Sequence, residues 1–371
     1  MSSKHPLLKY FIALQQISGI GNITARQLIA YLGSVEAVFT EKQSVLQKVP
    51  GVGPLLSANI KEKDYLAIAE KELEFIDKYK IKAQTFLDSS YPNRLKQCED
   101  APLVLFQKGK GNLNKAIHIS IVGTRKATEY GKHYCKKIIQ DLKEYGINPV
   151  IISGLAYGVD ACSHKAALNE DLETWAVLGH GLDRIYPSQH KNLAKQILEK
   201  GSLLTEFSHG SFPAPSNFIS RNRIIAGLSD LTIIIESARK GGSLVTADLA
   251  FNYNREVMAV PGRIGDTKSE GCNFLIKSNK ASMLENFDDI IYTMGWNDKH
   301  KLNKNKQLNL FEQLSSEEKI LLEFLRKNEN SSIDKIMRES NIDKNKVSIF
   351  LLNLEFINLI KVLPGKRYRA L

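Results

Sequence analysis

The amino-acid sequence predicts an α/β protein whose centre is a Rossmann-like, doubly wound and mostly parallel sheet. From His118 onward, short apolar runs alternate with stretches of helical periodicity. Strands that are apolar along their whole length are typical of parallel sheets covered by helices on both faces. Glycine-rich turns follow most of these runs, at the strand ends where such sheets bind ligands. We therefore expect a Rossmann-like domain at residues 81–296, with 81–117 as a lead-in segment.

The apolar runs define the predicted strands. They lie at residues 119–122, 150–152, 176–178, 203–204, 232–235 and 257–260. One further strand is expected at 102–106, within an otherwise irregular lead-in segment. Because parallel neighbours need a crossover connection, strands that alternate with helical stretches indicate repeated βαβ units.

Residues 1–80 are predicted to form a separate domain of short helices, from the spacing of their apolar residues. The segments 17–21 and 49–53 both read apolar-x-Gly-apolar-Gly and both lead into a helical stretch. They look like helix-hairpin-helix turns, so we expect a helix-hairpin-helix or SAM-like domain. Amides in such turns bind DNA phosphate without reading sequence, which makes Gly51 and Gly53 candidate auxiliary DNA contacts. A structural hairpin or a protein contact explains the pattern equally well.

The C-terminal part is predicted to be a winged-helix domain at residues 315–371. A polar, Lys/Asn-rich linker at 297–314 precedes it. Helical patterns at 317–327, 333–340 and 344–354 are followed by a hairpin around Pro364 and Gly365. Lys366 and Arg367 make the wing basic and are further auxiliary candidates for DNA contact. The helix at 344–354 is mostly apolar, which favours a protein-interaction or auxiliary DNA role over specific duplex binding.

Composition bounds the partners and the compartment. The chain carries 51 Lys and Arg against 40 Asp and Glu, a net charge of +11, which favours a polyanionic partner. The four cysteines are far apart and form no CxxC pair, so we expect reduced thiols in the cytoplasm, without a disulfide framework or zinc site. No signal-peptide pattern or membrane-length apolar run is present. We expect no metal and no cofactor.

The strongest candidate site lies in the turns that follow the predicted strands. Glycine lets the backbone approach a ligand closely, and helix N-termini present unpaired N–H groups to anions. Hydroxyl and arginine side chains add donors. Several such turns on one sheet edge make a phosphate cradle, for which we predict Gly123, Thr124, Arg125, Ser153, Gly154, Gly158, Arg221, Asn222, Arg223, Lys240, Gly241, Gly242, Ser243 and Thr246.

Structural roles compete with ligand binding at several positions. At least one of Arg221 and Arg223 is expected to contact phosphate, but either can instead clamp Asp160 or Glu206. Asp160 is expected to cap the helix that follows it. Cys162 is expected to be a small packing residue.

Enzyme motifs are missing from the predicted sheet. The turn after the first strand lacks GxGxxG, and the chain contains no GxxxxGK[ST] loop. The machinery for hydride transfer and for ATP hydrolysis is therefore absent, and we expect a binding protein that is not an enzyme.

Six motifs follow one another along the chain: VGTR at 122–125, SGLAYGVD at 153–160, LGHGLDRIYPSQH at 178–190, RNRIIAGLS at 221–229, ESARKGGSLVTADLA at 236–250 and VPG at 260–262. In this order they resemble the DprA (Smf) family of DNA-processing proteins, and the flanking domains fit the same layout. The resemblance implies a mediator of recombination that binds single-stranded DNA without sequence preference in a basic pocket. It also implies protection of incoming DNA, a homodimer, and loading of RecA during natural transformation or homologous recombination.

The resemblance also assigns residues. Matched to the family's motifs, Arg125, Ser153, Gly154, Gly158, Arg221, Arg223, Gly241, Gly242, Ser243 and Thr246 contact DNA. Asn273, Phe274 and Ile276 lie in a segment that resembles the family's dimer contact. Tyr157 stands where some relatives carry Lys or Arg, so one phosphate contact is missing there. Its ring is a candidate to stack on a base instead, and we include it in the predicted DNA site.

Two other functions compete with this one. Residues 240–248 distantly resemble the PGGxGTxxE loop of nucleotide phosphoribohydrolases, with Asp248 where the glutamate stands. A carboxylate there is able to act as an acid or base, and this hypothesis predicts turnover of free nucleotides. A winged-helix transcriptional regulator predicts instead sequence-specific duplex binding that survives loss of residues 118–295.

Overall fold

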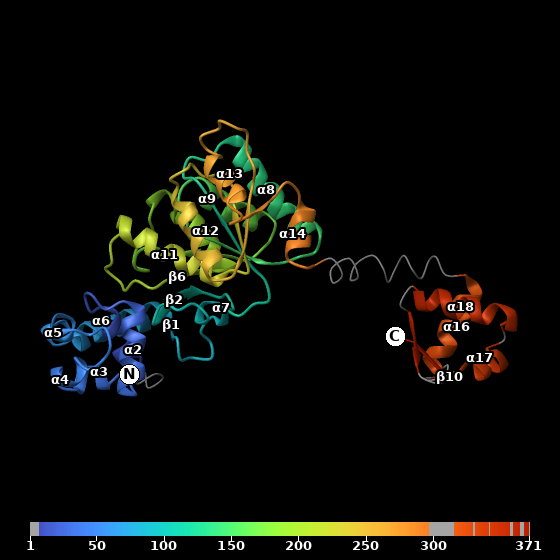
Figure 1. The fold of residues 1–371 in the computed structure, drawn as a ribbon, viewed down its shortest axis with the longest axis horizontal. Coiled ribbons are helices and arrows are strands. Elements are labelled where there is room, and N and C mark those ends of the chain that lie inside the picture. Colours follow the sequence, from blue (N-terminus) through green and yellow to red (C-terminus); the bar gives the residue numbers. More distant parts are fainter. Residues whose placement is uncertain are drawn as a thin grey trace. The chain divides into compact units, whose positions relative to one another are not determined.

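The computed structural model describes residues 7–296, 315–328, 331–340, 342–356, 359–363 and 367–370 (Figure 1). These residues fall into two compact units, the first ending at Met294 and the second beginning at Gly295. The predicted linker at 297–314 lies outside the described residues. Among the helices that are described, none is both long enough and apolar enough to cross a membrane.

A nine-stranded sheet forms the centre of the first unit, in the order β1-β2-β6-β5-β4-β3-β7-β8-β9. Its strands are β1 Lys82–Thr85, β2 Val104–Gly109, β3 His118–Val122, β4 Val150–Ser153, β5 Thr174–Val177, β6 Ser202–Thr205, β7 Leu231–Ile234, β8 Glu256–Ala259 and β9 Ser282–Met283. All neighbours from β6 to β9 run parallel, while β2 is antiparallel to both β1 and β6. The predicted mostly parallel sheet is confirmed, and the six predicted core strands appear as β3 to β8.

Helices cover both faces of this sheet. Along β3 to β6 pack α9 Val159–Asn169 and α10 Lys191–Lys200, and α8 Glu129–Glu144 packs against α9. The helix α11 Pro215–Leu228 packs with α12 Gly242–Asn252. The chain steps outward from β3 to β6, and α11 then returns it to β7 on the other side of β3. Right-handed crossovers place the helices of the two halves on opposite faces. The carboxyl ends of β3 and β7 therefore flank a topological switch point.

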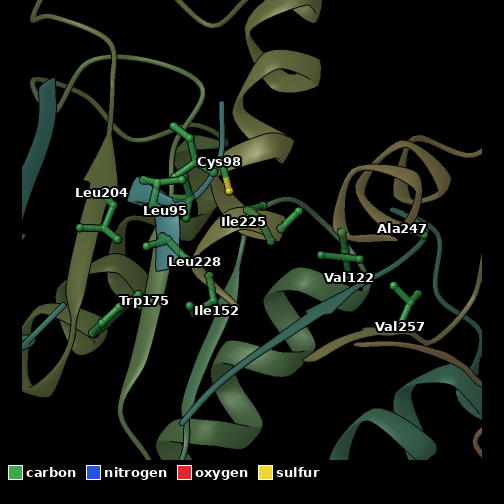
Figure 2. Close-up of a cluster of buried hydrophobic side chains, with 14 of the residues drawn as sticks. Leu95, Cys98, Val122, Ile152, Trp175, Leu204, Ile225, Leu228, Ala247 and Val257 are labelled. Atoms are coloured by element: carbon green, nitrogen blue, oxygen red, sulfur yellow. The ribbon is translucent and has the colours of Figure 1, made fainter. Parts of the chain in front are cut away.

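Short elements complete the first unit. They are α7 Asn93–Lys96, the 3₁₀ turn Ser188–His190, α13 Glu270–Lys277 and α14 Phe287–Thr293. The main apolar core joins the sheet to the helices and to the lead-in segment. Figure 2 shows Val122, Ile152, Trp175 and Leu204 packed with Ile225, Leu228, Leu95 and Cys98. Strands β4 to β7 are buried at every position, which explains why their sequences show apolar runs instead of alternation.

From residue 7 to the first strand, the structure describes six helices: α1 Leu8–Gln15, α2 Asn22–Leu32, α3 Ala37–Thr40, α4 Gln43–Leu46, α5 Pro54–Glu62 and α6 Tyr65–Tyr79. The two repeated turns share one geometry, because Gly21 and Gly53 are extended N-caps of α2 and α5. Gly19 and Gly51 precede them with φ of 82° and 81°, a left-handed conformation that glycine adopts without a steric penalty.

The lead-in segment is more regular than the sequence predicts. β1 and β2 extend the sheet. Val104 and Phe106 of β2, and Leu103 just before it, belong to an apolar core shared with the N-terminal helices. Helix α1 packs against both strands. β1 has the sequence KAQT, which contains no apolar run, so its pattern carries no strand signal.

The described residues of the second unit form three helices and a small sheet. Its elements are α16 Ser316–Lys327, β10 Ser331–Ser332, α17 Ile333–Glu339, α18 Lys344–Phe356, β11 Ile360–Leu363 and β12 Arg367–Ala370, with the strand order β10-β12-β11. Leu321, Leu325, Ile336, Val347 and Leu351 form its core. β11 and β12 pair antiparallel, but the turn at 364–366 lies outside the described residues. The winged-helix interpretation stays a prediction.

Two buried histidines are held neutral within the first unit. His118 Nδ1 lies 2.8 Å from Leu228 O, an acceptor, so this nitrogen carries the proton. His164 Nδ1 lies 2.7 Å from Thr174 Oγ1, whose own proton is donated to a carbonyl, so His164 Nδ1 is again the donor. Burial is the main cause that lowers the pKa of His118 to about 4 and that of His164 to about 3.

Acid should therefore destabilise the first unit. In the unfolded chain both histidines titrate near pH 6.5, so below that pH the unfolded state binds more protons than the folded state. Their contribution to stability is complete above about pH 6.5 and falls by up to about 1.4 kcal/mol per pH unit for each histidine as the pH drops towards the folded pKa.

Urea denaturation near pH 7 and near pH 5 measures this loss. His164→Gln should lose less free energy of unfolding over that interval than the wild type does, because glutamine does not titrate. An equal loss in the two proteins would show that His164 is not the group responsible.

Candidate functional site

A pocket of about 830 Å³ opens at the topological switch point between β3 and β7. We call it the switch-point pocket. Its walls come from the β3–α8 turn, the first half of α11 and the β7–α12 loop, as expected for a doubly wound sheet. Among the predicted cradle residues it is lined by Gly123, Thr124, Arg125, Arg221, Asn222, Gly241, Gly242, Ser243 and Thr246.

The β3–α8 turn is held by Glu236, a buried glutamate just beyond β7. The Thr124 amide donates to the Glu236 carbonyl at 2.8 Å. The Glu236 carboxylate accepts the Thr128 amide at 2.9 Å and the Thr128 hydroxyl, and Thr128 caps α8. With the turn fixed in this way, Arg125 stays exposed at the pocket, and its guanidinium lies 5.6 Å from the centre of the Phe218 ring.

The β4–α9 loop packs directly on that turn. Gly158 has φ of 75°, and a Cβ atom at this residue would lie 2.3 Å from the Thr124 carbonyl oxygen. Only glycine fits both the left-handed backbone and the close approach. Ser153, at the end of β4, is buried and donates its hydroxyl to the Ile121 carbonyl at 2.7 Å. These two predicted cradle residues therefore shape the pocket and do not line it.

Asp160 secures the same loop from the first turn of α9. Its carboxylate accepts the amides of Gly154 and Ala156, each at 3.2 Å. Burial raises the pKa of this carboxyl group, and Arg221 opposes that shift. Asp160 therefore binds the loop before its helix, where the sequence predicted a cap on the helix itself.

Arg221 lies on the buried floor of the pocket. It donates to the Gly154 carbonyl at 2.7 Å and to the Val177 carbonyl. Burial lowers its pKa to about 10, while Asp160 opposes the shift, so the guanidinium is charged at neutral pH. The pocket thus has a positive floor as well as the exposed Arg125 at its wall.

Arg223 has the structural role that the sequence left open as an alternative to phosphate binding. It forms a buried ion pair with Glu206 and donates to the Asp100 carbonyl at 2.6 Å. Burial raises the pKa of Glu206, and Arg223 opposes the shift. The structure does not bring Arg223 to the switch-point pocket; it uses this side chain to tie α11 to the end of β6 and to the lead-in segment.

Two other predicted residues also lie outside the pocket lining. The exposed Tyr157 donates its hydroxyl to Gln189 at 2.7 Å, and its ring meets His190 edge-on at 5.1 Å between centroids. Lys240 is exposed in the turn before α12. Both lie in loops on the carboxyl edge of the sheet, outside the walls that the other residues form.

The sequence did not predict that one wall of the pocket is aromatic. The rings of Tyr186 and Phe218 lie 5.6 Å apart at an angle of 32°. The guanidinium groups of Arg125 and Arg221 lie 5.6 and 5.9 Å from the centre of the Phe218 ring. Tyr186 is 47% exposed. Both aromatic residues lie in or beside quoted motifs, but nothing in their spacing predicts that they meet.

The auxiliary candidates stand apart from this pocket. Gly51 and Gly53 occupy the second hairpin turn of the helical part, and both are exposed. Arg367 is exposed at the start of β12, and Lys366 lies outside the described residues. Within the described ranges, no cluster of three or more His, Cys, Asp or Glu side chains is placed to hold a metal ion.

The segment assigned to a dimer contact has local roles in the chain. The Asn273 side chain both donates to and accepts from Gly262, at 3.0 and 3.1 Å. The Arg239 guanidinium lies 3.6 Å from the centre of the Phe274 ring, and Ile276 packs half-buried against the main core. The homodimer stays a prediction.

Comparison with known protein families gives two matches. A model of DNA recombination-mediator protein A matches residues 82–295, and a model of the SAM-like helix-hairpin-helix tandem matches residues 11–63. The second match confirms the helix-hairpin-helix prediction for the N-terminal part.

Individual relatives extend the match along the chain. The sequence is 30% identical to protein Smf of Synechocystis sp., covering 97% of this chain and 98% of that protein. It is 39% identical to DNA processing protein DprA of Streptococcus pneumoniae, over 56% of this chain and 72% of that protein. It is 40% identical to protein Smf of Escherichia coli, over 53% of this chain and 52% of that protein.

Two solved structures resemble the first unit. The X-ray structure of DprA from Streptococcus pneumoniae superposes with a TM-score of 0.65 at 33% identity, covering 76% of this chain and 97% of that one. DNA processing protein A from Helicobacter pylori, described for its unique single-stranded DNA binding mode, superposes with a TM-score of 0.52 at 30% identity. It covers 58% of this chain and 96% of that one.

The buried ion pair predicts that Arg223 contributes to folding stability and that Arg125 does not. Arg223→Ala leaves Glu206 buried without its partner, so the free energy of unfolding should fall by about 3–5 kcal/mol. Arg125→Ala, at an exposed position, should change it by no more than about 0.5 kcal/mol. Denaturant titration compares the two variants.

A double variant distinguishes the effect of an unpaired buried carboxylate from the effect of lost side-chain packing. Glu206→Gln combined with Arg223→Met removes the stranded charge, so it should be more stable than Arg223→Ala alone. If the double variant is as unstable as the single one, packing and not the uncompensated carboxylate dominates at this site.

Proposed function

The chain belongs to the DNA recombination-mediator protein A (DprA/Smf) family of DNA-processing proteins, and from that premise we propose that it binds single-stranded DNA without sequence preference in the switch-point pocket. The observation that carries this proposal is one cavity that combines phosphate-binding groups with an aromatic wall. A single strand needs both, because its phosphates are charged and its bases are unstacked.

The phosphate side of the pocket consists of Arg125, Arg221 and the start of α12. Gly242 and Ser243 are the first residues of α12, so their amides have no acceptor within the helix and stand at the positive end of its dipole. Backbone amides and guanidinium groups bind phosphate without reading base identity. Binding through these groups should therefore be independent of sequence and sensitive to salt.

The base side is the pair of Tyr186 and Phe218. Every base has a π-face, so stacking on aromatic rings tolerates any sequence and contributes about 1–3 kcal/mol per base. Arg125 lies close to the same wall, so one nucleotide can place its phosphate on the guanidinium and its base on the rings. Duplex DNA keeps its bases stacked inside the helix and gains nothing from such a wall.

We propose that this site binds and does not catalyse. Asp248, the acid–base candidate of the phosphoribohydrolase hypothesis, forms an ion pair with Lys280 at 2.7 Å and does not line the pocket. Asp160 borders the pocket, but its carboxylate already accepts two loop amides and faces Arg221. Neither carboxylate is presented as a free base. Incubation with nucleoside monophosphates should therefore release no free base or ribose phosphate.

Family membership supports finer proposals. We propose that the chain acts in the cytoplasm, protects incoming single-stranded DNA, forms a homodimer through the segment around Asn273, Phe274 and Ile276, and loads RecA on the bound strand during natural transformation or homologous recombination. Sedimentation of the full chain tests the dimer. Nuclease digestion of single-stranded DNA bound by this protein tests protection, and RecA filament assembly on the same complex tests RecA loading.

Arg125→Ala should weaken binding to labelled oligo-dT. It should also reduce the slope of log K against log salt by about 0.7, the value for one phosphate contact on a single strand. Fluorescence anisotropy across a salt series measures both quantities, and a matching duplex in the same assay tests the preference for single strands.

Lys143→Ala is the control, since Lys143 is a partly exposed cation in the last turn of α8, away from the pocket end of that helix. Both variants lose one positive charge. If they weaken binding and change the slope equally, the effect is one of net charge, and the switch-point pocket is not the DNA site.

Tyr186→Ala should weaken oligo-dT binding by about 1–3 kcal/mol through the loss of one stacked base, with the salt slope unchanged because no phosphate contact is removed. Tyr292→Ala, at an exposed tyrosine on α14, is the control and should bind as the wild type does. A changed salt slope in Tyr186→Ala, or unchanged affinity, would contradict a stacking role.

A further inference from the structure

Cys135 and Cys162 face each other where α8 packs against α9. Cys135 is fully buried on α8, and Cys162 is partly exposed in the first turn of α9. The Cys162 thiol lies 3.8 Å from the Lys132 carbonyl, one helical turn before Cys135. Helical side chains tilt towards the N-terminus, so the Cys135 side chain lies over the same turn. The two thiols therefore lie close together where α8 packs on α9, and each affects the pKa of the other.

The surroundings give the two thiols opposite properties. The neighbouring Cys135 thiol lowers the pKa of Cys162, and Lys136, Lys132 and Lys165 lower it further against the effect of burial. The neighbouring Cys162 thiol, together with burial, raises the pKa of Cys135. A cysteine near a helix N-terminus and beside lysines is the kind that reacts as a thiolate. Burial instead raises the pKa of Cys98 and Cys272.

We propose that Cys162 and Cys135 form a peroxide-sensitive modification site, in which Cys162 is oxidised first and Cys135 then closes a reversible disulfide between α8 and α9. A partly exposed reactive cysteine with a resolving cysteine in contact is the arrangement found in redox-sensing proteins. The proposal goes beyond the binding of DNA and does not depend on it. It also replaces the packing role that the sequence suggested for Cys162.

The reaction proceeds in two steps that balance with hydrogen peroxide as the oxidant. The Cys162 thiolate attacks one peroxide oxygen; the S–O bond forms as the O–O bond breaks, and the departing hydroxide takes a proton and leaves as water. The Cys135 sulfur then attacks the sulfenic sulfur of Cys162; the S–S bond forms as the S–O bond breaks, and the Cys135 proton leaves with the hydroxyl group as a second water. The two sulfurs together supply the two electrons that reduce the peroxide.

The site lies beside the switch-point pocket. The Val159 amide, at the start of α9, donates to the Thr124 carbonyl at 3.2 Å, and Cys162 follows within the same helical turn. α8 in turn starts from the β3–α8 turn that carries Arg125. A bond between the two helices would therefore join the two elements whose first turns meet at the pocket wall.

The test uses the full chain treated with hydrogen peroxide, then alkylated with a maleimide under denaturing conditions and mapped by mass spectrometry. We expect Cys135 and Cys162 to escape alkylation and to appear as one disulfide-linked peptide within a single chain. Cys98 and Cys272 should be alkylated as in the untreated chain. Dithiothreitol added before the maleimide should restore the alkylation of Cys135 and Cys162.

Variants separate the two roles. Cys162→Ser should keep all its remaining thiols at the same peroxide dose, and Cys135→Ala should leave a sulfenic acid on Cys162 that dimedone traps. Cys98→Ser is the control and should form the disulfide as the wild type does. The proposal is overturned if Cys135 and Cys162 of the wild type are still fully alkylated by the maleimide after peroxide treatment. It is also overturned if the disulfide joins other cysteines or two different chains.

Discussion

The reversal of strand order at β3 is the constraint on which the rest of the first unit depends. Right-handed crossovers send β3 to β6 in one direction, and α11 must then return the chain to β7 on the opposite side of β3. The turns after β3 and β7 are thereby separated by the width of one strand, with helices leaving to opposite faces. A doubly wound sheet opens a crevice at such a point, so the place of the pocket follows from the connectivity of the strands.

Buried polar groups hold this opening in shape. Glu236 fixes the turn after β3, Asp160 fixes the loop after β4, and Arg221 joins that loop to β5 through two carbonyls. Each of these charges is satisfied by several hydrogen bonds, as a buried charge must be. The motifs that mark the family are therefore as much a scaffold as a binding surface. Arg223, paired with Glu206, is the plainest case of a motif residue that serves the fold.

Helix N-termini concentrate chemistry at the same edge. The start of α12 offers free amides, and the start of α9 places Cys162 near the positive end of a helix dipole. Both are consequences of parallel strands, because every crossover helix then begins at the carboxyl edge of the sheet. The anion binding proposed for the pocket and the reactivity proposed for Cys162 thus share one physical origin, and the lysines around Cys162 lower its pKa further.

Sequence alone predicted strands β3 to β8 and the glycine-rich turns that follow most of them, because both depend on local pattern. Strands β3 to β7 are buried at every position and β8 at all but its first, so they read as apolar runs. Gly158 is a glycine because its backbone has positive φ against a neighbouring carbonyl. β1 was missed because its strand character comes from pairing with β2 and not from its own residues. Only the tertiary structure decided that Arg221 reaches the pocket while Arg223 pairs with Glu206, that Tyr186 meets Phe218, and that Cys135 meets Cys162. These pairs are distant along the chain, so no spacing encodes them; the packing of helices on the sheet brings them together.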